Sequence, residues 1–162
     1  MKTITAQRTS QSALHSILTR LESPQLWNHY DAEVEITGSA TTGLDVRTSA
    51  PLPASETPEQ ARRFMTQDAR VEQHFSLPAT AADAPSARAQ QSVTVTGMPV
   101  TVTAVIDFSA LDPSDVAGSG TQISVNAEVS SKMLLLGSAV ESAAAPAIER
   151  MLTKRLQEIA DL

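Results

Sequence analysis

The stretch that most constrains the fold is the end of the chain, residues 137–162. Its apolar side chains recur at the three- and four-residue spacing of one helical stripe, namely Val140, Ala144, Ala147, Ile148, Met151, Leu152, Leu156 and Ile159. Ser138 followed by Glu141 has the form of a capping box, which predicts where this helix begins. Because Pro146 lacks a backbone amide, it predicts either a bend in the helix or a helix that begins at Pro146.

Short alternating runs of apolar and polar residues fill most of the remaining chain. Such alternation is typical of antiparallel strands with one solvent-facing side, and it occurs at residues 2–8, 33–36, 44–47, 70–77, 88–96, 100–108 and 123–129. Two short helices are expected near residues 14–21 and 24–30, with Ser10 and Ser23 as their N-caps. A brief helical segment carrying Ala61, Phe64 and Met65 is expected to open at residues 55–58. The predicted order is one strand, two helices, about six strands and the long helix, which indicates one α+β domain over residues 1–162.

Composition limits the classes of partner. Apolar residues make up 41% of the chain and charged residues 19%, as in globular rather than disordered proteins. The net charge of −6 opposes binding to phosphates, so nucleic acid is not an expected partner. No stretch approaches the roughly 20 apolar residues that cross a bilayer, and cysteine is absent. We therefore expect a cytoplasmic protein without an integral membrane segment or disulfide bonds.

The sequence contains no pattern that indicates a catalytic residue, a metal site or a cofactor. The histidines lack metal-ligand spacing and are expected at the surface; they are His15, His29 and His74. No Gly-x-Ser-x-Gly motif is present. Acidic residues on the predicted outer face of a hairpin could hold a cation, although such groups are typical of a solvated face; they are Glu33, Glu35 and Asp45. Arg150, Lys154 and Arg155 complement the negative end of the long helix's dipole and require no partner for that role.

The small residues of the long helix allow two interpretations. Ala143, Ala144 and Ala147 lie where the helix would face the sheet, and small side chains either leave room for a ligand or let the helix pack closely. Gln73 and Gln91 lie on otherwise apolar strand faces. They could orient a ligand, or they could bond to each other, to the backbone or to a trapped water. If a cavity exists, the candidates for its lining are Trp27, Gln73, Phe75, Gln91, Val102, Phe108, Met133, Ala144, Ile148 and Met151.

Three local stretches carry a resemblance to a known family. They are Ala-Arg-Arg-Phe at residues 61–64, Gly-Met-Pro-Val at residues 97–100, and Leu-Leu-Leu-Gly at residues 134–137. These stretches are similar to an uncharacterised actinobacterial family, a domain of unknown function in the START-like (SRPBCC) superfamily of pollen allergens, lipid-transfer domains and polyketide cyclases. The order of elements resembles the helix-grip fold of that superfamily, in which a curved antiparallel sheet wraps around a long C-terminal helix. The resemblance implies an apolar cavity between the sheet and the helix, and it implies no catalytic residues.

These expectations favour a protein that binds a small hydrophobic or amphipathic molecule, lipid-like or polyketide-like, between the sheet and the helix. A cyclase or aromatase is an alternative, but it would need an ionisable group inside the cavity, and no Asp, Glu or His falls on a predicted inner face. A third interpretation is a cavity-free domain that acts through protein contacts. The expected assembly is a monomer, or a homodimer joined through a strand edge.

Overall fold

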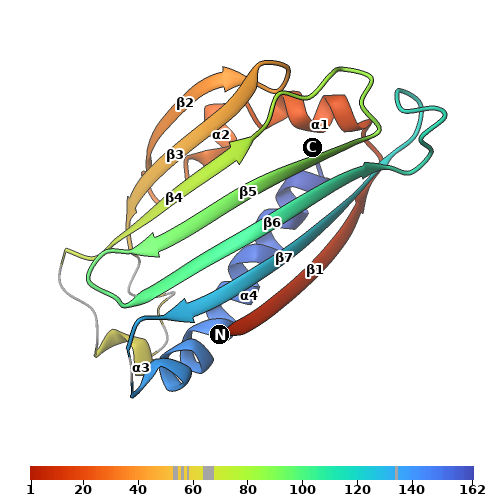
Figure 1. Ribbon diagram of the computed structural model, residues 1–162. Helices are drawn as coiled ribbons and strands as arrows, with labels where there is room; N and C mark the ends of the chain where they lie inside the picture. The colour runs from red at the N-terminus through yellow and green to blue at the C-terminus, as the bar shows by residue number, and fades with distance from the viewer. Residues whose placement is uncertain (53–54, 56, 58, 64–67, 134) are drawn as a thin grey trace.

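The computed structural model describes residues 1–52, 55, 57, 59–63, 68–133 and 135–162. In these residues seven strands form one sheet, and four helices accompany it (Figure 1). The elements in chain order are β1 (Lys2–Ser10), α1 (Leu14–Arg20), α2 (Pro24–Trp27), β2 (Glu33–Ser39), β3 (Gly43–Pro51), α3 (Glu59–Arg62), β4 (Arg70–Leu77), β5 (Ser86–Val95), β6 (Val100–Ala110), β7 (Thr121–Ser131) and α4 (Gly137–Ala160). The predicted order is confirmed, whereas Phe64 and Met65 lie outside the described residues.

The sheet is antiparallel throughout, in the order β1-β7-β6-β5-β4-β3-β2. The first strand therefore pairs with the last one, and the remaining strands follow one another as a meander. Every second residue of a strand faces the same side of a sheet. On β6 this rule buries Val100, Val102, Ala104, Ile106 and Phe108. The apolar alternation of the sequence thus marks the inner face of the sheet.

Helix α4 lies along the inner face of the curved sheet and packs chiefly against β1 and β7 (Figure 1). It begins at Gly137 and continues through Pro146, so a helix start at Pro146 is wrong. Both ends of α4 are seated in the core, through Val140 near the start and Leu156 near the end. The middle of the helix is less buried, which leaves space between it and the sheet. Among the described helices, none combines the length and the apolar character that a bilayer span requires.

The start of α4 differs from the predicted capping box. Leu136 is the N-cap, and no side chain bonds to the helix start there. The buried Glu141 carboxylate turns to the sheet instead: its Oε1 accepts the backbone N–H of Ser131 at 2.8 Å, and its Oε2 accepts a hydrogen bond from the N-terminal ammonium of Met1. These two donors, the ammonium above all, hold the pKa of Glu141 below its ordinary value. A tertiary contact has replaced the local cap.

Glu141→Gln is expected to reduce the loss of stability in acid. The pKa of Glu141 is lower in the folded protein than in the unfolded chain, where it is near the ordinary value of 4.5. The ionised carboxylate therefore stabilises the fold fully at pH values above the unfolded pKa. This stabilisation is lost as the pH falls through the lower pKa of the folded protein. The unfolding free energies of wild type and Glu141→Gln, measured with urea from about pH 7 to about pH 3, should therefore converge in acid. Glu128→Gln, at an exposed position of β7, controls for the loss of one negative charge. A gap between wild type and Glu141→Gln that stays constant with pH would contradict this account.

The two short helices close one end of the inner face. The buried residues of α1 are those of the predicted stripe, Leu14, Ile17 and Leu18, followed by Leu21. Ser23 is the N-cap of α2 and Pro24 its first residue, as predicted. The predicted cap at Ser10 is wrong, because Ser10 ends β1 and its Oγ accepts the backbone N–H of Ser12 at 3.2 Å, while Ala13 is the N-cap of α1.

Candidate functional site

An open cavity of about 700 Å³ lies between α4 and the inner face of the sheet. Val93 of β5 and Val102 of β6 form part of its floor, Ile148 of α4 lies opposite them, and Trp27 forms part of one wall. Residues of the segment between β3 and α3 also line it. The volume falls within the roughly 300–1,000 Å³ of typical small-molecule sites. From the sequence, the small residues of the long helix were compatible either with a ligand cavity or with close packing against the sheet. The structure has a cavity there.

The cavity follows from how α4 is seated. The helix packs chiefly against β1 and β7, and the cavity lies between its residues Ala144, Ala147 and Ile148 and the strands β4 to β6. Ala144 and Ala147 both line the cavity and are only half-buried, so their small size creates space rather than close contact. Met151 lines it too and is 38% exposed. Several apolar side chains of α4 thus face open volume, which is the arrangement an apolar ligand would cover.

Gln73 and Gln91 meet on the floor of this cavity. They lie on the neighbouring strands β4 and β5, and Nε2 of Gln91 donates to Oε1 of Gln73 at 2.8 Å. The hydrogen bond between the two amides confirms one of the alternatives that the sequence left open. Both side chains also line the cavity, so their remaining amide groups are within reach of a bound molecule.

Gln73→Leu is expected to lower the free energy of unfolding by about 1–3 kcal/mol, because it leaves the amide of the buried Gln91 without its partner. The double variant Gln73→Leu/Gln91→Leu removes both polar groups and should lose less than the sum of the two single variants. Urea unfolding of the four proteins measures this coupling. Additive losses would show that the hydrogen bond contributes nothing to stability.

Trp27 is held firmly in the cavity wall. Its indole Nε1 donates to the carbonyl of Leu21 at 2.7 Å, and its ring lies 5.1 Å from that of Phe75, tilted by 49°. The side chain is buried, although it contributes surface to the cavity. Because these contacts fix the ring, Trp27 is a rigid part of the site rather than a lid.

The chain after α2 turns sharply to reach β2. The backbone N–H of Ala32 donates to the carbonyl of His29, and both residues between them have positive φ angles, 53° at Tyr30 and 57° at Asp31. This is the geometry of a primed turn, which suits Asp31 but is uncommon for a bulky residue such as Tyr30. The turn places His29 on the cavity wall, where the sequence did not predict it.

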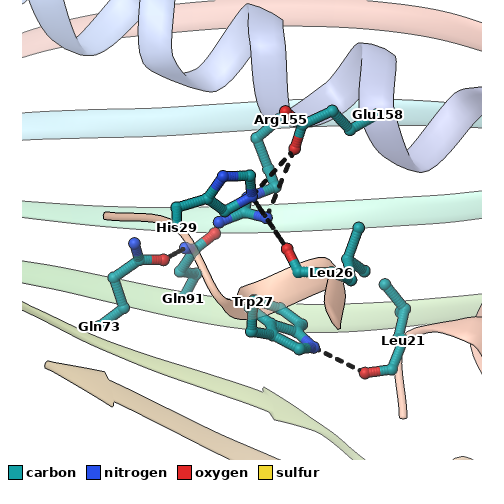
Figure 2. A network of polar contacts seen from close by, with 8 residues as sticks. All are labelled: Leu21, Leu26, Trp27, His29, Gln73, Gln91, Arg155 and Glu158. Atoms are coloured by element: carbon teal, nitrogen blue, oxygen red, sulfur yellow. Dashed lines mark hydrogen bonds and ion pairs between the residues drawn. The ribbon is translucent and has the colours of Figure 1, made fainter. Parts of the chain in front are cut away.

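Arg155 is the functional candidate that the sequence analysis missed. It reaches from α4 to the end of α2, where its Nη1 donates to the carbonyl of Leu26 and lies 2.9 Å from Nε2 of His29 (Figure 2). The guanidinium carbon is 5.3 Å from the centre of the Trp27 ring. The side chain is only 15% exposed, with Oε2 of Glu158 at 3.6 Å. Burial lowers the pKa of Arg155, a shift that Glu158 opposes.

Most of the predicted lining residues do surround the cavity, but three lie elsewhere. The lining includes Trp27, Gln73, Gln91, Val102, Ala144, Ile148 and Met151. Phe75 and Phe108 are fully buried in the core, and Met133 packs against its edge. None of these three, nor Ala143, is among the described residues of the lining. The pattern identified the inner face correctly but could not separate packed core from open cavity.

The ionisable residues are placed differently from expectation. The prediction that no Asp, Glu or His would face the cavity is wrong, because His29 and Glu158 both line it, 3.3 Å apart. On the outer face, Nε2 of His74 lies 2.5 Å from Oδ2 of Asp45 and lowers the pKa of that carboxyl. His15 is half-buried on α1. Within the described ranges, no group of three or more His, Asp or Glu side chains is arranged to hold a metal ion.

A family model described as "Protein of unknown function (DUF2505)" matches residues 3–161. The chain belongs to the DUF2505 family. No curated protein matches this DUF2505 chain at a significant level. The predicted resemblance to a domain of unknown function is thereby confirmed.

Solved structures identify the fold of this DUF2505 protein. It is similar to the protein TTHA0849 from Thermus thermophilus, with 9% identity, a TM-score of 0.59, and coverage of 98% of this chain and 94% of the other. It is similar to truncated norcoclaurine synthase from Thalictrum flavum, with 13% identity, a TM-score of 0.55, and coverage of 98% and 91%. It is also similar to Ara h 8.0201, with 14% identity, a TM-score of 0.53, and coverage of 98% and 95%. At these identities the likeness shows the fold alone, and with the curved antiparallel sheet and the long C-terminal helix that fold is the helix-grip fold.

Proposed function

We propose that this protein binds one small apolar or amphipathic molecule in the cavity between α4 and the sheet. The observation that carries the proposal is the open volume of about 700 Å³ under the middle of α4. Apolar side chains such as Val102, Ile148 and Met151 face it. Each Å² of apolar surface that a ligand removes from water contributes about 25 cal/mol. The Gln73–Gln91 pair offers polar groups that could orient the molecule.

A second candidate is an enzyme that uses the same cavity. His29 and Glu158 are the specific observation in its favour, since both are ionisable and both line the cavity. One of the similar folds is named as a synthase. However, fold likeness does not carry function, and His29 and Glu158 already contact Arg155. Binding therefore remains the primary proposal.

Trp27 provides a direct test, because it is the single tryptophan of the chain and it lines the cavity. A bromine atom quenches indole fluorescence only on near contact, so ω-bromodecanol bound in the cavity should quench Trp27 saturably. Plain decanol should displace the probe and restore the emission. Quenching that rises linearly without saturation, or that decanol does not reverse, would show collision in solvent and would contradict the proposal.

A further inference from the structure

We infer that the preferred ligand of this cavity carries an anionic head group with paired oxygens, a carboxylate or a phosphate, and that Arg155 binds it. The inference rests on the proposed function and assigns its ligand class. Figure 2 shows the guanidinium of Arg155 reaching from α4 to His29 and Leu26, and its carbon lies 5.3 Å from the centre of the Trp27 ring. A largely buried cation therefore borders a cavity that is also lined by apolar side chains.

Some N–H groups of the Arg155 guanidinium have no hydrogen-bond partner among the described residues. Both hydrogen bonds of Arg155 with described residues, to Leu26 and to His29, use Nη1. Nε and Nη2 make no hydrogen bond to any described residue, and neither is a fully buried nitrogen without a partner. In the described part of the chain, the one fully buried side-chain nitrogen or oxygen without a partner is Nδ1 of His15. Since Arg155 lines the cavity, a ligand there can reach these N–H groups. A planar guanidinium matches the two oxygens of a carboxylate or a phosphate.

The described part of the chain neutralises this cation incompletely. Among the described residues, the nearest carboxylate is that of Glu158, at 3.6 Å from Nη1, beyond hydrogen-bond distance, and it is 30% exposed to solvent. The other contacts of the guanidinium are a neutral carbonyl, an imidazole nitrogen and the face of an indole. Burying a charge costs free energy unless a partner compensates it. An entering anion would supply that compensation through charge-assisted hydrogen bonds.

The charge around the cavity favours the same ligand. Among the described lining residues, the basic side chains are Arg62, Arg150, Lys154 and Arg155, whereas the carboxylates are Glu59 and Glu158. The described part of the lining therefore has more basic than acidic side chains, in a chain whose net charge is −6. A cavity whose lining has an excess of positive charge attracts anions and raises their local concentration. A ligand with an apolar tail and an anionic head group would use both the apolar and the basic parts of the lining. The tail would cover Val93, Val102 and Ile148, and the head group would bind Arg155.

Calorimetric titration with decanoate, decyl phosphate and decanol tests the inference, since the three share one tail. Wild type should bind one or both anions more tightly than decanol. Arg155→Met, which keeps length and removes charge, should weaken anion binding by about 10- to 100-fold and change decanol binding by less than about threefold. Arg155→Lys should retain part of the anion preference. The comparison of decanoate with decyl phosphate decides between the two head groups.

Controls separate this role from a structural one. Arg88→Met removes a basic residue that pairs with Asp107 on the outer face, and it should leave all three affinities unchanged. If Arg155→Met weakens decanol and the anions equally, Arg155 only holds α2 to α4 and the inference is wrong. Equal affinity of wild type for decanol and both anions also overturns it, while leaving the proposed function intact. Failure of all three compounds to bind would overturn the proposed function itself.

Discussion

Ala144→Phe is expected to weaken binding of decanol by at least about tenfold while leaving the protein folded. Ala144 lies in the middle of α4, where its side chain borders the cavity. A phenyl ring placed there would occupy the volume that the ligand needs. Enlarging a residue in a well-packed core usually costs about 1–3 kcal/mol, but here the ring enters open space. The free energy of unfolding should therefore change by less than about 1 kcal/mol.

Ser142→Phe is the matched control for this prediction. It adds the same side chain to the same helix at an exposed position outside the described lining. Its affinity for decanol should equal that of wild type. If Ala144→Phe binds as well as wild type, the ligand does not occupy the space under α4. If Ala144→Phe is instead destabilised by several kcal/mol, that space is filled by protein atoms in solution.

Phe108→Ala is expected to cost about 3–5 kcal/mol of stability, the largest effect of a single substitution predicted for this chain. Phe108 is fully buried on β6, opposite Ile123 of β7 and Ala87 of β5. It lies outside the described cavity lining, so its ring packs against protein and its removal leaves a void. Urea unfolding followed by circular dichroism measures the loss.

Thr103→Ala on the same strand is the control, because Thr103 is exposed on the outer face, and it should change stability by less than about 0.5 kcal/mol. The folded fraction of Phe108→Ala should bind decanol as wild type does. A loss below about 1 kcal/mol would mean that β6 repacks around the missing ring. The pair of predictions thus separates residues that build the core from residues that border the cavity.

The sheet and the long helix could be predicted because their patterns are local. Two-residue alternation on β4 to β7 and the three- and four-residue spacing on α4 each depend only on neighbours along the chain. The prediction from local sequence was wrong where a side chain could bond either to a neighbour in the chain or to a distant residue. Glu141 had a suitable capping partner in Ser138, yet it bonds to Ser131 and to the chain's N-terminus. A buried carboxylate gains more from those donors than from a solvent-exposed cap.

The cavity and Arg155 could not be read from sequence spacing. Whether Ala144 packs closely or borders open volume depends on how far α4 stands from the sheet, which its buried ends determine. Arg155 was predicted to complement the helix dipole, but its partners Leu26 and His29 lie 129 and 126 residues away along the chain. The turn after α2 places His29 at the cavity, and although Asp31 is compatible with a positive φ angle, Tyr30 gives no indication of such a turn.

The central claim is that the space under α4 holds one small molecule. Native mass spectrometry tests it most directly, on protein purified gently from cells and then incubated with decanoate and with decanol. The account predicts one adduct per chain that disappears on denaturation, present for wild type and strongly reduced for Ala144→Phe. Wild-type protein that keeps the mass of the bare chain under all of these conditions would contradict the account.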